Sequence, residues 1–139
     1  MAIRPGQVVA YTTPPAVELY TKTVQVAFTD TVRFDAFTIP KGAVLAGVYV
    51  MGTANGGAVT SAVVTLGTGA SGTEVLNAYN VKTSGAGYFA AGSAAGSFIG
   101  QQMTADQLIK AVYTGVGGSD SGTWLVKVEY YFPQSGYSF

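Results

Sequence analysis

Cysteine and histidine are both absent from the 139 residues of the chain. Without cysteine there is no disulfide framework. Without histidine the chain lacks the side chain that most often acts as a general base and most often binds metal ions. Zinc sites with nitrogen and sulfur ligands are therefore excluded, and no histidine can activate the many serine and threonine hydroxyls as nucleophiles.

Charge is also scarce. Charged residues make up 10% of the chain, compared with roughly 25% in ordinary soluble domains. Seven basic residues balance seven acidic ones, so no net charge attracts a polyanion and the sequence argues against nucleic acid as a partner. A weakly charged surface is easily covered by a partner, and near-zero net charge promotes association. We expect a homo-oligomer, with a monomer of neutral polar surface as the alternative.

Long apolar runs are missing as well. The first residues, MAIRPGQVVAYTTPP, contain no apolar run of signal-peptide length. Two uncharged stretches, residues 42–73 and 83–105, are rich in Gly, Ser, Thr and Asn, unlike a membrane helix. The sequence therefore predicts a soluble protein made in the cytoplasm, with no membrane partner.

Alternation of apolar and polar residues with a period of two dominates the rest of the chain. It is clearest in residues 123–132, TWLVKVEYYF, and is repeated in residues 18–28. Residues 44–51, VLAGVYVM, are apolar on both faces, as in a central strand. About eight such segments, separated by glycine-rich turns, predict an all-β antiparallel sandwich or barrel. The residues expected in its core are Val24, Val26, Phe28, Phe34, Val48, Val50, Trp124, Val126 and Val128.

Other segments are less clear. Residues 74–81, EVLNAYNV, fit neither period cleanly, and a strand is favoured. In residues 103–115, MTADQLIKAVYTG, Thr104 and Gln107 have capping-box spacing, but Gly115 comes too soon for a stable helix. A strand with Ile109, Ala111 and Tyr113 on one face is preferred. Residues 83–100 read as a long loop or a weak strand pair around Tyr88 and Phe89, and residues 7–11 as one short strand.

The segment LGTGASG, residues 66–72, contains the spacing G-x-G-x-x-G of a dinucleotide-binding turn. That fingerprint needs a helix beginning at the third glycine and an acidic residue about 20 positions later. Here a helix would soon meet Ser84 and Gly85, and the later region GYFAAG contains no acid. The motif therefore predicts a turn with glycines at positive φ, and no cofactor.

Carboxylates offer no catalytic pattern. The seven acidic residues are scattered along the chain, at Glu18, Asp30, Asp35, Glu74, Asp106, Asp120 and Glu129. Sequence alone leaves open a convergent pair such as Asp35 with Glu129, but solvated positions on strands or turns explain them better. One acid, Asp120, in its loop is a weak calcium signal. We predict no enzyme activity, no catalytic residue and no metal site.

The two ends of the chain differ from its middle. Residues 1–16 contain Pro5, Pro14 and Pro15 and read as an extended arm, residues 17–133 as the sandwich, and residues 134–139 as a tail after Pro133. Aromatic residues in a tail favour docking on a neighbouring subunit over folding back on the same domain. The candidate contact residues are Tyr11, Pro14, Pro15, Phe132, Tyr137 and Phe139.

Three segments carry a resemblance: FTIPKGAVLAGVYV at residues 37–50, VVTLGTGASGTEVL at residues 63–76 and GTWLVKVEYYF at residues 122–132. Together they resemble small virion proteins of tailed bacteriophages, of the capsid decoration or cement type. The resemblance spans about 110 residues and rests on turn and strand signals. It implies a jelly-roll-like β-sandwich on the outside of the virion, with the major capsid protein as partner and no catalytic residue or cofactor. Because capsids offer threefold positions, a homotrimer is favoured.

A second hypothesis is a tail-associated or glycan-binding β-sandwich module of a phage. Glycan binding would use an exposed Trp or Tyr as a stacking platform. Trp124 is the single tryptophan, and its position in an alternating strand favours the core.

Overall fold

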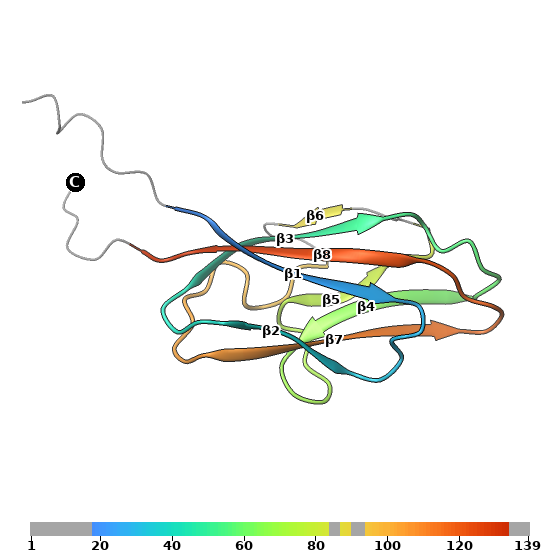
Figure 1. The fold of residues 1–139 in the computed structure, drawn as a ribbon, viewed down its shortest axis with the longest axis horizontal. Helices are drawn as coiled ribbons and strands as arrows, with labels where there is room; N and C mark the ends of the chain where they lie inside the picture. The colour runs from blue at the N-terminus through green and yellow to red at the C-terminus, as the bar shows by residue number, and fades with distance from the viewer. Residues whose placement is uncertain (1–17, 84–86, 90–93, 134–139) are drawn as a thin grey trace, which may run out of the picture.

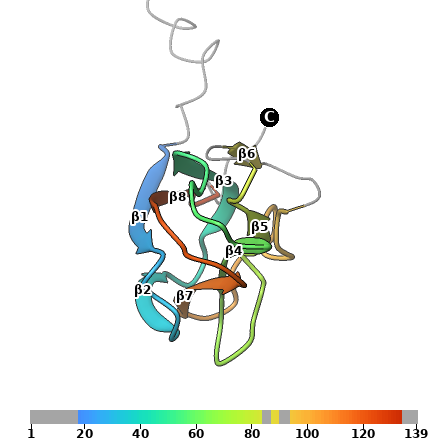
Figure 2. The same cartoon turned by 90° about the vertical axis from the view of Figure 1, so that its right-hand side faces the viewer.

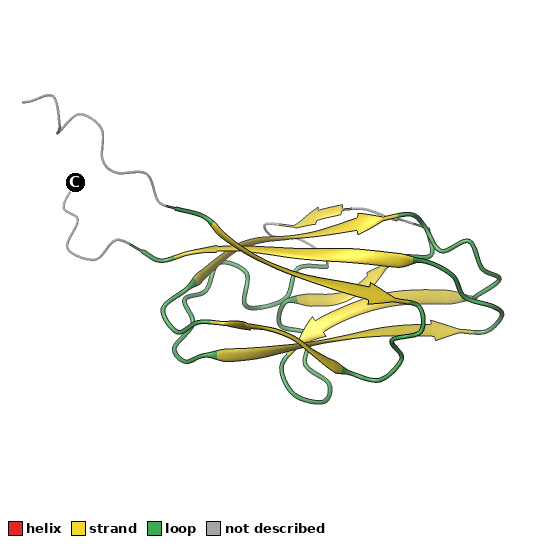
Figure 3. Cartoon of the chain, viewed as in Figure 1, coloured by secondary structure: helices red, strands yellow, loops and turns green. Residues whose placement is uncertain are grey.

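The computed structural model describes residues 18–83, 87–89 and 94–133. These residues form strands and loops without a helix (Figure 3). In chain order the strands are β1 (Tyr20–Ala27), β2 (Phe34–Ile39), β3 (Val44–Gly52), β4 (Ser61–Gly67), β5 (Leu76–Asn80), β6 (Gly87–Phe89), β7 (Gln107–Val116) and β8 (Thr123–Tyr131). The prediction of an all-β chain with about eight strands is confirmed.

The strands form two stacked sheets of four (Figures 1 and 2). Sheet A has the order β1-β8-β3-β6, and sheet B has the order β2-β7-β4-β5. The first strand pairs with the last, β2 with β7, β3 with β6 and β4 with β5, all antiparallel. This nesting is a long antiparallel ribbon wound into a sandwich, which is the jelly-roll topology. The predicted fold class is confirmed.

The core lies between the two sheets and is made by the inward side chains of β1 to β5, β7 and β8, together with several loop residues. On β8, Trp124, Val126 and Val128 are fully buried, as the alternating pattern predicts. On β7, Ile109 and Tyr113 point into the same core. The segment with capping-box spacing is therefore a strand, because tertiary packing of its alternating apolar row outweighs the local helix signal. The strand favoured within residues 74–81 is present as β5. In residues 83–100, for which a loop or a weak strand pair around Tyr88 and Phe89 is predicted, the short strand β6 contains both residues.

Three residues differ from the expected core. Phe28 is 37% exposed, so its predicted burial is wrong. Strand β1 ends at Ala27, where the Asp30 side chain accepts a hydrogen bond from the Ala27 amide and turns the chain before Phe28 can enter the core. Val24 and Phe34 are only partly buried, although both pack against the core.

Strand β2 contains an irregularity that the period-two pattern did not predict. Phe34 and Phe37 are three positions apart and would lie on opposite faces of a regular strand. The pairing with β7 shifts register between Asp35 and Phe37, and both phenylalanines pack against the core. A β-bulge adds one residue to a strand and so brings two odd-spaced side chains to the same face.

Replacing Val126 with alanine is expected to lower the free energy of unfolding by about 1–3 kcal/mol, through lost apolar burial and a cavity. Val126 is fully buried in the central strand β8. Urea unfolding followed by circular dichroism measures the change. A loss below about 0.3 kcal/mol is typical of surface positions and would place this row of β8 in solvent.

Candidate functional site

The described residues offer no metal cluster, since no three His, Cys, Asp or Glu side chains among them come together. Within the same residues no helix is long and apolar enough to cross a membrane. The carboxylate pair left open by the sequence does not form. Asp35 lies on β2 of sheet B, 3.5 Å from the Lys110 ammonium, whereas Glu129 lies on β8 of sheet A.

The G-x-G-x-x-G segment forms a tight loop between β4 and β5. No helix begins at Gly72, and the next element is β5. Gly69 has a φ of 63°, a conformation that favours glycine. At Gly67 a Cβ atom would collide with the backbone of Gly72. The predicted turn is confirmed, but the predicted positive φ holds for Gly69 and not for Gly67 or Gly72, which are needed for close approach of the backbone.

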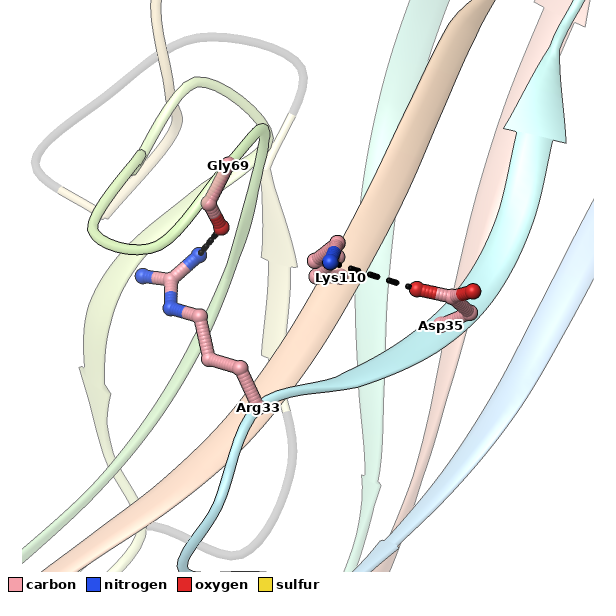
Figure 4. A network of polar contacts seen from close by, with 4 residues as sticks. All are labelled: Arg33, Asp35, Gly69 and Lys110. Atoms are coloured by element: carbon pink, nitrogen blue, oxygen red, sulfur yellow. Dashed lines mark hydrogen bonds and ion pairs between the residues drawn. The ribbon is translucent and has the colours of Figure 1, made fainter.

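This loop, residues 67–74, projects from sheet B (Figure 2) and is braced from two sides. Arg33, just before β2, reaches over and donates a hydrogen bond to the carbonyl oxygen of Gly72 at 2.7 Å. It also donates to the carbonyl oxygen of Gly69 at 3.4 Å (Figure 4). From within the loop, the Glu74 carboxylate accepts hydrogen bonds from the amide and the hydroxyl of Thr68. The loop is therefore held in one shape by charged groups whose hydrogen-bonding capacity is used internally.

The surroundings of the Glu74 carboxylate shift its pKa. Partial burial on its own would raise its pKa, but the hydrogen bonds from the Thr68 hydroxyl and amide, together with the positive charge of Arg33, outweigh burial. The pKa of Glu74 therefore lies below its ordinary value. A lowered pKa in the folded state means that the ionised form stabilises the fold, and that this contribution disappears as the pH falls through the folded pKa.

Replacing Glu74 with glutamine is expected to lower the free energy of unfolding at pH 7 by about 1 kcal/mol, because a charge-assisted pair of hydrogen bonds is weakened. Wild type loses the same contribution as the pH falls through the folded pKa, so the difference between the two proteins should be smaller at pH 3 than at pH 7. Urea unfolding at both pH values measures the difference. A difference that is unchanged at low pH would show that ionisation of Glu74 does not support the loop.

A buried polar network lies at the end of the sandwich away from the start of β1 and the end of β8. Asn55 is 6% exposed, donates to the Tyr113 hydroxyl at 2.9 Å and accepts from the amide of Gly57 at 2.7 Å. Burial raises the pKa of Tyr113, and its hydrogen bond to the Asp120 carboxylate raises it further, to about 12. The hydroxyl therefore stays protonated at neutral pH and joins two loops together, rather than serving as a general base.

Trp124 lies beneath this network and cannot form a sugar-binding platform. Its ring is fully buried and stacks on Tyr113 with 5.6 Å between the ring centroids. Its indole N–H donates to the Thr53 carbonyl oxygen at 2.8 Å. The prediction that Trp124 belongs to the core is confirmed.

Three aromatic side chains cluster at one end of sheet A. At this end β1 begins and β8 finishes (Figure 1). Tyr20 stacks on its cross-strand partner Tyr130 with centroids 5.6 Å apart, and Phe132 meets both rings edge-on. Tyr20 is 40% exposed and Phe132 37%. These three residues, called the aromatic cluster below, form a partly exposed apolar surface at the base of both terminal segments.

Of the six predicted contact residues, one lies among the residues that the structure describes. Phe132 lies in the aromatic cluster, while Tyr11, Pro14, Pro15, Tyr137 and Phe139 lie outside the described residues. The sequence analysis missed Tyr20. The signal was present, since Tyr20 continues the row of Val24 and Val26 on β1 and so points the same way.

Comparison with known proteins shows which solved structures share this fold. No family model matches the chain, and no curated protein matches it. Several solved phage structures do match its fold. A chain of the cyanophage Pam1 capsid asymmetric unit aligns with a TM-score of 0.63 and 20% identity, over 94% of this chain and 100% of that chain.

Two further structures show the same fold. For the acidic stable capsid of Helicobacter pylori bacteriophage KHP30, the TM-score is 0.61 at 14% identity, over 86% of this chain and 92% of that chain. For the capsid of Ralstonia phage GP4, it is 0.57 at 15% identity, over 88% and 90%. The chain therefore shares its jelly-roll sandwich with chains found in phage capsid structures.

Proposed function

We propose that this chain is a structural protein of a bacteriophage virion that binds the outside of the capsid and decorates or cements it. The observation that carries the proposal is the jelly-roll order of the two sheets, together with its match to chains in capsid structures of three phages. The partner in this role is the major capsid protein, and the location is the assembled virion.

The extent of the structural matches supports an added component rather than a shell-forming one. The alignments cover 100%, 92% and 90% of the matched chains. Each of those chains is therefore essentially one sandwich of this kind, and not a larger protein that contains one. A chain made of one sandwich suits a component that attaches to a shell built by another protein.

The use of the charged groups supports a structural role over a catalytic one. Glu74 and Asp30 accept hydrogen bonds within turns, Asp106 accepts one from the Lys41 amide, and Asp120 holds Tyr113. Carboxylates committed to internal hydrogen bonds stabilise loops and are poorly placed to act on a substrate.

We further propose a homotrimer whose copies meet through the aromatic cluster and the adjoining terminal segments. Exposed aromatic rings provide large contact areas for few rotatable bonds. Within the described residues, Phe132 is the contact residue in this proposal, supported by Tyr20. Tyr11, Pro14, Pro15, Tyr137 and Phe139 remain proposed contacts between chains.

Gold-labelled antibody against this chain, applied to intact particles and imaged by electron microscopy, tests the location. The proposal predicts labelling over the head surface. Labelling confined to the tail supports the tail-associated alternative instead, and absence from purified particles contradicts a virion role altogether.

The contact residues are tested by sedimentation of the purified chain. Replacing Phe132 with serine, or removing residues 134–139, is expected to weaken self-association while the β-sheet signal in circular dichroism is kept. The matched control replaces Leu108 with serine, since Leu108 is 44% exposed on sheet B, away from the aromatic cluster. Equal association of all these variants would move the contacts elsewhere on the sandwich.

A further inference from the structure

The outward face of sheet A is a second surface with the character of a contact. It consists of the outward rows of its three long strands, called the sheet A face below: Thr21, Thr23 and Gln25 on β1, Leu125, Lys127, Glu129 and Tyr131 on β8, and Tyr49 and Met51 on β3. We propose that this face binds the same face of a second copy of the chain around a twofold axis.

The apolar part of the sheet A face is contiguous. Leu125 and Met51 stand directly opposite each other in the register of β8 and β3, and they are 40% and 39% exposed. Directly paired residues on one face of a sheet have side chains in contact range. Tyr49 adjoins them, with the Lys127 ammonium 4.5 Å from its ring centroid. Two exposed aliphatic side chains beside an aromatic ring form an apolar patch in the middle of a mostly uncharged face.

The charged part of the face is two opposite charges on one strand. Lys127 and Glu129 are two residues apart on β8 and therefore point to the same side. They do not pair with each other, since the ion pair between described residues is Lys110 with Asp35. Glu129 makes no hydrogen bond or ion pair with any other described residue, unlike the acidic side chains of the turns and loops. Among the described residues, the Glu129 carboxylate is therefore available on this face to pair with a positive charge of a second copy.

A twofold axis makes this pattern complementary to itself. The axis lies in the plane between the two stacked faces and runs at right angles to the strands. It passes over β8 at the position of Val128. Lys127 of each copy then faces Glu129 of the other, and Leu125 faces Tyr131. Register places Val48 at the same level on β3, so Tyr49 faces Gly47 of the second copy, a residue without a side chain. Met51 faces the level of Val44, whose side chain is only 9% exposed. A twofold contact uses one surface patch twice, which requires such self-complementarity.

Other surfaces of the described sandwich are less suited to this contact. The outer side of sheet B is crossed by Arg33 and the projecting loop, and its ion pair already joins Lys110 to Asp35 (Figure 4). On the edge strand β1, Lys22 stands in the row of the core-facing Val24 and Val26. A charged side chain on the inward row of an edge strand discourages edge-to-edge pairing with another sheet. The twofold contact is thereby directed to the sheet A face.

This inference deepens the proposed function, because it names a surface by which copies on a capsid would meet. Neighbouring threefold positions of a closed shell are related by twofold axes. A trimer held by the aromatic cluster and a twofold contact through the sheet A face would together link copies into a net. The test below is done in solution without capsids, so its failure and a failure of capsid binding can be told apart.

The experiment is a charge-swap series measured by sedimentation over micromolar to millimolar concentrations. Lys127→Glu and Glu129→Lys each place like charges opposite one another at two symmetry-related points, and each is expected to weaken the twofold association about tenfold. The double variant, Lys127→Glu with Glu129→Lys, restores opposite charges across the axis and should return the affinity to within about threefold of wild type.

Lys110→Glu is the matched control, since it reverses a partly exposed charge on the central strand β7 of sheet B. It should leave association unchanged, and circular dichroism confirms that every variant is folded. Recovery in the double variant alone supports the proposal. A double variant as weak as the single ones, or a wild-type chain whose association none of the charge variants changes, overturns it.

Discussion

Replacing Trp124 with alanine is expected to lower the free energy of unfolding by about 3–5 kcal/mol, the range for removing a large aromatic side chain from a core. The ring is fully buried, stacks on Tyr113 and donates a hydrogen bond to the Thr53 carbonyl oxygen. The surrounding backbone is shaped to the ring, because a Cβ at Gly122 would lie 2.7 Å from it. Such a site cannot collapse onto the space left by alanine. The free energy of unfolding of a whole domain is only about 5–15 kcal/mol. This one substitution therefore removes a large part of it.

Trp124→Phe is the control for this prediction. It keeps an aromatic ring against Tyr113 but removes the indole N–H, so the expected loss is about 1–2 kcal/mol. Urea unfolding followed by far-ultraviolet circular dichroism measures both variants. A loss under about 1 kcal/mol for the alanine variant would mean that the indole is not enclosed as described.

Replacing Gly72 with alanine is expected to destabilise the fold by about 3 kcal/mol, at the upper end of the cost of overpacking. A Cβ at this position would collide with the Glu74 carboxylate and the Thr68 carbonyl oxygen, and would lie 2.7 Å from the Thr68 nitrogen. Two of these three obstacles are backbone atoms, so the loop must open. Opening also breaks the contacts of Arg33 and Glu74 that brace it.

Gly69→Ala in the same loop measures the cost of an unfavourable backbone conformation without the steric collision expected at Gly72. No atom lies within 4 Å of a Cβ built on Gly69, whereas its φ is 63°. The expected loss is about 1–2 kcal/mol, the cost of a left-handed conformation for an L-residue. Thermal unfolding compares the two variants. Equal losses, or a larger loss at Gly69, would contradict the packing described for this loop.

The sequence predicted the strands well because their burial follows a simple rule. In β8 every second residue faces the core, so the row from Trp124 to Val128 can be read directly from the alternation. The rule fails where the strand is irregular. The bulge at Asp35 and Phe37 and the turn that removes Phe28 from the core depend on backbone pairing with distant segments. Periodicity along one strand contains no information about these pairings.

The candidate surfaces were less predictable than the fold. Phe132 could be chosen because it follows the last strand next to a proline. Its contacts with Tyr20 and Tyr130 require β1 and β8 to be neighbours, although they lie at opposite ends of the sequence. The sheet A face has the same origin, since Leu125 and Met51 meet only through the pairing of β3 with β8. Surfaces assembled from distant strands become visible once the sheet order is known.

Electron cryo-microscopy of phage particles with and without this chain tests the proposed capsid role most directly. The gene for the chain is deleted, and purified chain is added back to the deleted particles. Difference density is expected on the outer surface of the head, and it should return on adding the chain. It should fit a sandwich with the strand orders β1-β8-β3-β6 and β2-β7-β4-β5. Difference density on the tail, inside the shell or nowhere on the particle would contradict it.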